Sequence, residues 1–254
     1  MVVCQLRFVC QQELSLETAQ NAISQLFEEY RYNGQILGRE FGLSLTNDAF
    51  VCRLVCPEET SLQSANDSEE VKDAKQALAA LQVDGPIVEV IGLESQSDFS
   101  DMCEQPRGYV LYSTFVQSCS PVRCSEHFMP VPLYKLPAEV RYDLIKWQEN
   151  QAACDQLQMN ALGSLESQMV NQLSDPHSDL NQQGRRLANA IEHTTEKPVY
   201  QYLYRVGGES KKKELERKCP SCGGDWSLQA PLFELFDFKC DACRLVSNLS
   251  WDFQ

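Results

Sequence analysis

The sequence predicts a protein of the α+β class, and three observations lead to that expectation. The first 93 residues contain short runs with an apolar residue at every second position, and two segments with helical spacing lie between them. Residues 138–204 are dominated by longer segments whose apolar residues recur three or four positions apart. The last 36 residues carry two Cys-x-x-Cys pairs among alternating apolar residues. We therefore expect parts of different construction along one chain.

Size and composition are those of a globular protein. With 254 residues, 43% hydrophobic and 23% charged, the chain has room for two compact units and a small appendage. No run of eighteen apolar residues is present, so we expect no membrane partner. The N-terminal residues lack the basic start, apolar stretch and cleavage site of a secretory signal. The expected location is the cytoplasm.

The N-terminal segment, residues 1–93, begins with a predicted strand and helix. In Val2–Cys10 the apolar residues alternate with polar ones, which is typical of a half-buried strand. Ser15 is a favourable N-cap for a helix with apolar residues at helical spacing. Asn33-Gly34 predicts the turn that ends this helix.

Two further strands, a helix and a fourth strand complete this segment. The strands are expected at Ile36–Leu45 and Ala49–Cys56, and a helix enters through the capping pattern that starts at Asp67. Gly85-Pro86 is expected to break that helix, and Ile87–Ile91 supplies the last strand. The order βαββαβ is that of the ferredoxin-like split motif, which forms one antiparallel sheet with both helices on one face.

Residues 94–206 are expected to be mixed and mainly helical. A strand is predicted at Tyr109–Val116, and a long helix starts at Pro137, a residue that favours the first helical turn. Gly163-Ser164 interrupts the helical pattern, and Ser178 caps a further helix. A strand follows at Pro198–Val206. Residues 207–218 then form a basic linker that begins with two glycines.

Two cysteine pairs define the last segment, residues 219–254. Cys219 and Cys222 form one Cys-x-x-Cys pair, Cys240 and Cys243 form the other, and seventeen residues separate them. Each pair presents two sulfurs on one side of a tight loop, where both can reach a metal ion at about 2.3 Å. A unit this small needs metal binding to contribute to its folding. We predict a zinc ribbon with one structural zinc ion; disulfides or a redox motif are the alternatives.

A second and weaker group of cysteines lies in the middle segment. Cys119, Cys124 and His127 fall within nine residues, with Cys103 upstream, and Cys124-x-x-His127 has the spacing of a metal-binding turn. Together these four residues could form a second zinc site. The alternative is a loop with unligated cysteines and a surface histidine. The twelve cysteines of the chain also favour a reducing compartment.

Charge is unevenly distributed along the chain, whose net charge is −14. Residues 1–93 carry 6 basic and 14 acidic side chains, whereas residues 205–218 carry 6 basic and 3 acidic ones. Non-specific affinity for nucleic acid comes mainly from Lys and Arg, so an acidic body favours a basic protein partner instead. The basic run holds the candidate nucleic-acid contacts, unless it is simply a solvated linker: Lys211, Lys212, Lys213, Arg217 and Lys218.

The C-terminal part resembles a bacterial family described as zinc-ribbon-containing, nucleic-acid-binding proteins. The resemblance is carried by Cys219-Pro-Ser-Cys-Gly-Gly-Asp-Trp and by residues 236–251, with further similarity at residues 131–137, 154–159 and 198–200. It covers about residues 105–254 and implies that the four paired cysteines are zinc ligands. It also implies contact with nucleic acid, and no reaction is attached to the family. Where the family has a Cys-x-x-Cys pair before Val131, this chain has Cys124-x-x-His127, which leaves a second metal open.

No catalytic arrangement is recognisable in the sequence. It contains no phosphate-binding loop, no nucleophile elbow and no His-Glu-x-x-His motif. His177 and His193 fall beside expected helix ends, where a solvated or capping role is the ordinary one. The sequence therefore predicts a non-enzymatic protein. Two functions stay open: nucleic-acid binding through the ribbon and basic run, or an acidic adaptor or regulator that docks on a basic protein.

Overall fold

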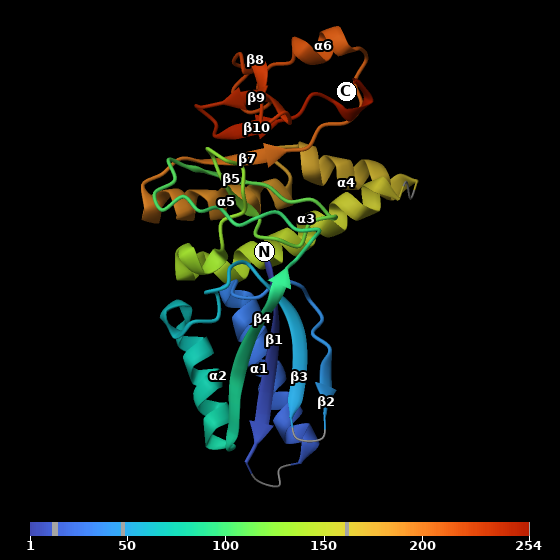
Figure 1. Cartoon of the computed structure of the whole chain (residues 1–254). Helices are drawn as coiled ribbons and strands as arrows, with labels where there is room; N and C mark the ends of the chain where they lie inside the picture. The colour runs from blue at the N-terminus through green and yellow to red at the C-terminus, as the bar shows by residue number, and fades with distance from the viewer. Residues whose placement is uncertain (12–14, 47–48, 161–162, 254) are drawn as a thin grey trace. The chain divides into compact units, whose positions relative to one another are not determined.

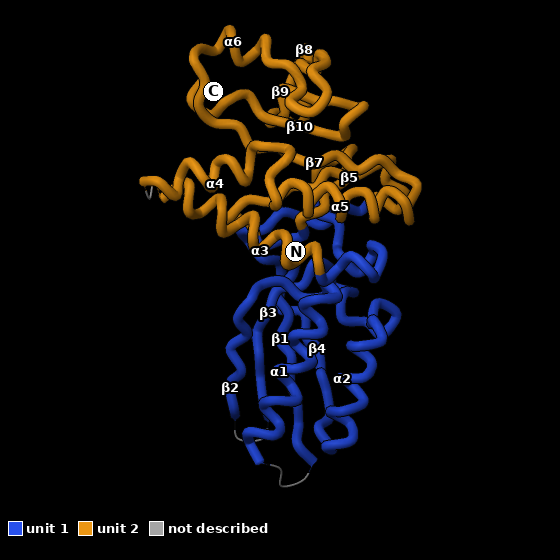
Figure 2. Tube along the Cα trace, turned by 180° about the vertical axis from the view of Figure 1, so that it is seen from behind, with its two compact units in different colours: residues 1–102, 118–120, 129–142 blue, residues 103–117, 121–128, 143–254 orange. Residues whose placement is uncertain are grey.

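The computed structural model describes residues 1–11, 15–46, 49–160 and 163–253 and has the predicted α+β composition. Its residues form two compact units, coloured separately in Figure 2. Unit 1 consists of residues 1–102, 118–120 and 129–142; unit 2 consists of residues 103–117, 121–128 and 143–254. No described helix has the length and apolar character needed to cross a bilayer.

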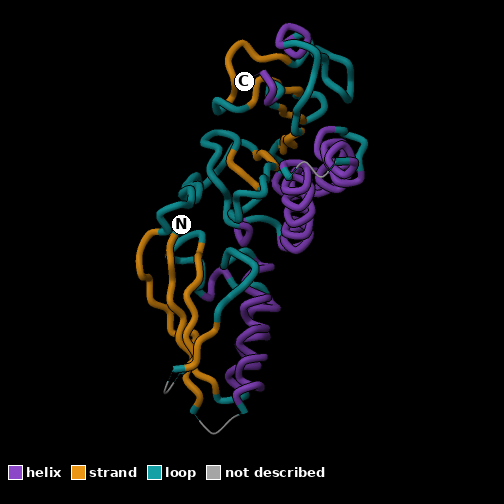
Figure 3. The backbone as a smooth tube through the Cα atoms, turned by 90° about the vertical axis from the view of Figure 1, so that its right-hand side faces the viewer, coloured by secondary structure: helices purple, strands orange, loops and turns teal. Residues whose placement is uncertain are grey.

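Unit 1 contains a four-stranded antiparallel sheet with strand order β2-β3-β1-β4. The sheet and its two helices, which Figure 3 shows edge-on, have these bounds: β1 Val2–Cys10, α1 Leu16–Asn33, β2 Leu43–Leu45, β3 Phe50–Cys56, α2 Glu69–Ala80 and β4 Val83–Leu93. Both helices bury their apolar sides in one core with the same face of the sheet. This connectivity is the βαββαβ order that the sequence predicts.

Several boundaries in unit 1 differ from the sequence prediction. The expected strand at Ile36–Leu45 is reduced to β2 and an isolated bridge from Leu37 to Val55. The N-cap of α2 is Ser68, whose hydroxyl accepts from the amide of Val71 at 3.3 Å. Asp67 instead pairs with Lys75 at 2.5 Å. Gly85-Pro86 lies inside β4, because α2 has already ended at Ala80.

Unit 2 is built on a six-stranded mixed sheet with strand order β6-β5-β7-β10-β9-β8. The strands are β5 Tyr109–Leu111, β6 Val122–Cys124, β7 Val199–Leu203, β8 Ser227–Leu232, β9 Phe236–Cys240 and β10 Leu245–Ser247. Strand β7 is parallel to both of its neighbours, β5 and β10, and the remaining pairs are antiparallel. The strands predicted at Tyr109–Val116 and Pro198–Val206 are shorter than expected.

Helix α5 packs along β7, and α4 packs against α5 (Figure 1). The helices are α3 Ala138–Met159, whose first turn belongs to unit 1, α4 Ser164–Ser174, α5 Asp179–Thr195 and α6 Lys211–Leu215. Ser178 caps α5 as predicted, since its hydroxyl accepts from the amide of Asn181. Short 3₁₀ turns η1, η2 and η3 lie at Ser64–Asn66, Leu133–Lys135 and Trp251–Phe253.

The C-terminal segment shares its sheet with the middle segment. Strand β10 pairs with β7 through Leu245–Gln201 to Ser247–Leu203, so residues 219–253 extend the sheet of unit 2. The segment expected as a flexible linker contains α6, and its Glu214 is buried. Residues 219–253 are therefore part of unit 2, because a strand pairing and the buried Glu214 connect them to the middle segment.

Candidate metal centre

The first cysteine pair lies on a tight turn just before β8. The amide of Gly223 donates to the carbonyl of Cys219 at 2.8 Å, and the amide of Cys219 donates to the carbonyl of Gly224 at 2.9 Å. Gly223 has a φ of +71°, in the left-handed region that glycine adopts without strain. The glycine after Cys222 thus lets the chain turn back so that both sulfurs of the pair lie on one side.

The second cysteine pair lies where β9 ends and the chain returns into β10. Cys240 is the last residue of β9, and Cys243 lies two residues before β10 begins. The residue after Cys243 is Arg244, with a φ of +54°, which corresponds to Gly223 in the first pair. A non-glycine residue in this region costs about 1 kcal/mol. The carbonyl of Arg244 accepts two hydrogen bonds that offset this cost, one from the amide of Gln201 at 2.8 Å and one from the guanidinium of Arg185 at 3.0 Å.

The two turns bring four sulfurs together. The Sγ atoms of Cys219, Cys222, Cys240 and Cys243 all lie within 4.8 Å of one another. The sulfurs of Cys222 and Cys240 are 3.7 Å apart. That separation is too long for a disulfide, whose sulfurs are about 2.05 Å apart. It matches the edge of a tetrahedron with metal–sulfur bonds of 2.3 Å, which is about 3.8 Å. The donor set therefore fits one tetrahedral metal ion.

The surroundings of the four thiols are unequal. Cys222 is exposed, and a hydrogen bond from the amide of Gly224 is the largest cause that lowers its thiol pKa to about 7. Burial raises the thiol pKa of Cys219 and of Cys240. A metal ion favours the thiolate form of all its cysteine ligands and would therefore compensate for that burial.

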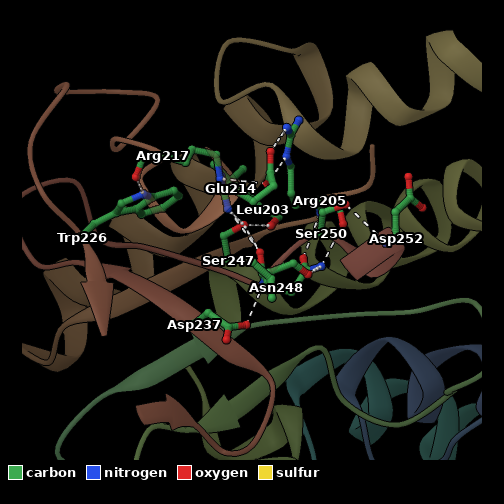
Figure 4. Close-up of polar contacts among 11 residues, drawn as sticks. Leu203, Arg205, Glu214, Arg217, Trp226, Asp237, Ser247, Asn248, Ser250 and Asp252 are labelled. Carbon is green, nitrogen blue, oxygen red and sulfur yellow. Dashed lines mark hydrogen bonds and ion pairs between the residues drawn. The ribbon is translucent and has the colours of Figure 1, made fainter. Parts of the chain in front are cut away.

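A polar network connects Arg205, Glu214 and Arg217 with the C-terminal segment (Figure 4). The guanidinium of Arg217 lies over the rings of Trp226 and Phe238, at 4.8 and 4.4 Å from their centroids. Glu214 forms an ion pair with Arg217 at 3.5 Å and another with Arg205. These contacts fix the segment that leads into Cys219, so the first turn is held from the linker side.

Asn248 and Ser247 connect the same network to β7. The Ser247 hydroxyl donates to the carbonyl of Leu203 at 2.8 Å. The Asn248 side-chain amide donates to the carbonyl of Arg205 at 2.8 Å, and its oxygen accepts from the amide of Arg205 and from the Tyr202 hydroxyl, each at 2.9 Å. Neither residue stands out in the sequence. Their small polar side chains at the end of a short apolar run are the only signal for them.

The predicted nucleic-acid contacts divide into two groups. Lys211, Lys212 and Lys213 are exposed on α6, and Lys213 pairs with Glu209. Lys218 pairs with Asp225, and Arg217 is held in the polar network of Figure 4. Trp226 is only 2% exposed, so its ring is packed inside the ribbon.

The second predicted cysteine group is only partly assembled. Ligand atoms of Cys103, Cys124 and His127 lie within 4.8 Å of one another in unit 2. Cys119 is absent from that group; it belongs to the stretch 118–120, which is part of unit 1. Sequence spacing could not reveal this, because Cys119 and Cys124 are only five residues apart but belong to different units.

Three family profiles match successive parts of the chain, each described as a domain of unknown function: DUF8589 at residues 1–92, DUF2310 at residues 103–204 and DUF8594 at residues 208–253. An "Uncharacterized protein" of Haemophilus influenzae is 45% identical over 248 residues, which covers 95% of both chains. A second protein of that name and organism is 51% identical over 168 residues, covering 65% of this chain and 82% of its own.

Among solved structures, one similar chain comes from Deinococcus radiodurans and is provisionally assigned as an antibiotic biosynthesis monooxygenase. It is 17% identical, covers 41% of this chain and all of its own, and superposes with a TM-score of 0.26. That score is too low to carry an argument. With 45% identity over 95% of both chains, the protein belongs to the same bacterial family as this Haemophilus influenzae protein.

Proposed function

We propose that this protein is a non-enzymatic adaptor, stabilised by zinc, that docks on a basic protein partner. In this proposal the N-terminal unit has the ferredoxin-like fold, and Cys219, Cys222, Cys240 and Cys243 hold one structural zinc ion in a ribbon. A zinc ion with four cysteine ligands has no open position for water or substrate, which supports a structural role for the ion.

Zinc is the ion that best suits the donor set. Four thiolates in tetrahedral arrangement select zinc or iron among the common protein metals, and exclude magnesium and calcium, which prefer oxygen ligands. The paired turns at Gly223 and Arg244 support the same conclusion, since each presents two sulfurs to one point. No step of a reaction is assigned to the ion.

The observation that carries the docking proposal is the charge that each unit exposes. Carboxylates in exposed positions lie on α1, α2 and β4 of unit 1: Glu17, Glu28, Glu69, Glu70, Asp73, Asp84 and Glu89. Among the described residues, Glu17, Asp73 and Glu89 have no ion-pair partner. By contrast, Arg217, Lys213 and Lys218 are engaged by neighbours in unit 2. Uncompensated negative charge favours encounter with a basic partner.

A comparison of charge variants tests this proposal. The triple variant Glu17→Gln, Asp73→Asn and Glu89→Gln removes three unpaired charges from exposed sites and should leave the fold intact. We expect the wild-type chain to co-purify from native cells with a basic protein in fixed stoichiometry, and the triple variant to lose most of that partner. The matched control, Lys211→Gln and Lys212→Gln, should retain it. Equal recovery with all three chains would contradict the proposal.

Nucleic-acid binding is the second candidate, and the exposure of Lys211 and Lys212 on α6 favours it. Neither lysine has an ion-pair partner among the described residues. If this candidate is correct, oligonucleotide binding at low salt falls steeply as salt rises. It should also weaken in the variant Lys211→Ala, Lys212→Ala and Lys213→Ala. Fluorescence anisotropy with single- and double-stranded oligonucleotides measures both effects, and no binding at low salt would eliminate the candidate.

A further inference from the structure

We propose that unit 2 contains a second metal site, separate from the ribbon, in which Cys103, Cys124 and His127 bind a zinc-type divalent ion. This site goes beyond the proposed function, because it lies outside the ribbon and rests on different residues. Its ligands come from two stretches of chain: Cys103 precedes β5, and Cys124 and His127 flank the turn that ends β6.

The geometry of the β6 turn fits a metal ion. The Sγ of Cys124 and the Nδ1 of His127 are 3.7 Å apart. A tetrahedral ion with a sulfur at 2.3 Å and a nitrogen at about 2.05 Å separates those two atoms by about 3.6 Å. The Cys103 sulfur lies within 4.8 Å of both. Small side-chain movements therefore suffice to bring the three donors to one ion.

Backbone contacts hold the β6 turn in this shape. The amide of Phe128 donates to the carbonyl of Cys124 at 2.9 Å, which closes the turn. The amide of Glu126 lies 3.5 Å from the Cys124 sulfur and points its hydrogen toward it. Cross-strand pairing of Cys124 with Tyr109 fixes the start of the turn on the sheet. Hydrogen bonds of this kind orient and stabilise a metal-bound thiolate.

Glu126 also connects the turn to the stretch that carries Cys103. Its carboxylate accepts from the amide of Arg107 at 3.0 Å, and its other oxygen pairs with the Arg107 guanidinium at 3.3 Å. The Cys103 sulfur lies 4.0 Å from the same carboxylate. The two contacts with Arg107 thus hold the stretch that carries Cys103 beside the β6 turn, through a residue that is not one of the three ligands.

The donor set indicates which ion the site takes and how tightly it holds it. Two thiolates and an imidazole favour zinc over magnesium or calcium. Cys124 is buried, Cys103 is half-buried and His127 is exposed, so one side of the site faces solvent. Three protein ligands hold an ion less firmly than four, so we expect this ion to exchange faster than the ribbon ion.

Elemental analysis of the full chain, prepared without chelator, tests the proposal. The wild-type protein should contain two zinc ions per chain. The variant Cys103→Ser, His127→Ala should contain one, because both positions are solvent-accessible and the ribbon is untouched. The matched control Cys119→Ser changes a nearby cysteine outside the group and should keep two. One zinc in all three chains would overturn the second site.

Cobalt substitution keeps the test decisive if occupancies are fractional. The difference in absorption between cobalt-loaded wild type and the double variant should show thiolate-to-cobalt charge-transfer bands; identical spectra would overturn the proposal. Failure of the ribbon proposal looks different. In that case the double variant holds no metal at all while the wild type holds one ion.

Discussion

At the scale of single residues, the structure assigns Arg217 a different role from the one that its basic sequence context predicts. From the sequence it belongs to a basic run and was predicted to contact nucleic acid. In the structure its guanidinium packs on Trp226 and Phe238, pairs with Glu214 and donates to the carbonyl of Asn248 at 3.2 Å. Burial is the largest cause that lowers the pKa of this guanidinium, to about 10. Its role here is to support the segment that carries the cysteine pairs.

The variant Arg217→Ala should therefore destabilise unit 2. It removes the cation from two aromatic faces and leaves the buried Glu214 with one cationic partner fewer. We expect a loss of about 2–4 kcal/mol in the free energy of unfolding. The exposed Lys211→Ala should change it by less than about 0.5 kcal/mol. Urea unfolding followed by tryptophan fluorescence measures both, and equal effects would contradict a structural role for Arg217.

At the scale of elements, the regular parts of unit 1 follow closely from the sequence. Period-two alternation in β1 and the Ser15 cap of α1 are local signals, and both elements form as predicted. Cys4 and Cys52 are buried on the core face of the sheet. The strand prediction at Ile36–Leu45 failed because strand formation there depends on a partner strand that is distant in the sequence. The stretch 36–42 has an apolar pattern but no strand beside it along most of its length, so only β2 forms.

Some features of the candidate site also follow from local sequence, whereas others depend on distant contacts. The convergence of the four paired cysteines was predictable from the sequence, because each Cys-x-x-Cys pair itself brings two sulfurs to one side of a turn. The pairing of β10 with β7, and the loss of Cys119 from the second group, depend on contacts between segments far apart in the sequence. Local patterns contain no information about such contacts.

The end of α1 provides a sharp test of element packing. Gly34 has a φ of +79° and caps the helix through its amide, which donates to the carbonyl of Arg31 at 2.9 Å. A Cβ at this position would lie 2.4 Å from the Cβ of the buried Leu133. We expect Gly34→Ala to cost about 2–4 kcal/mol of stability. Gly42→Ala, where no atom lies within 4 Å, is the matched control. Similar midpoints in urea for both variants would be inconsistent with this packing.

We expect metal removal to destabilise several neighbouring strands in the sheet of unit 2. The second cysteine turn leads directly into β10, and the Arg244 carbonyl in that turn accepts from the amide of Gln201 in β7. Chelation should therefore raise amide hydrogen exchange in β9, β10 and β7, with little change in β1 and β3 of unit 1. Hydrogen-exchange mass spectrometry resolves these segments. Unchanged protection in β9 and β10 after the metal has been removed would show that the ion does not support the sheet.

At the scale of the whole molecule, the chain combines two compact units with separate cores. The core of unit 1 lies between its sheet and α1 and α2, whereas the ribbon core contains Cys219, Trp226, Phe238 and Cys240. Only the second of these cores includes predicted metal ligands. The stability of the two units should therefore respond differently to metal.

Calorimetry with and without chelator should show that difference. We expect two unfolding transitions, of which chelation lowers the temperature of one and leaves the other in place, because a ligand stabilises only the unit that binds it. Limited proteolysis after each transition identifies the unit concerned. A single transition that shifts as a whole would mean that the units unfold together.

The central claim is that four cysteines at the C-terminal end hold one zinc ion. X-ray absorption at the zinc edge tests it most directly, on the variant Cys103→Ser, His127→Ala, which isolates the ribbon. We predict one zinc ion per chain with four sulfur neighbours at about 2.3 Å and no nitrogen or oxygen neighbours. Protein without zinc, or mass-spectrometric evidence of a disulfide between Cys219, Cys222, Cys240 or Cys243, would contradict the account.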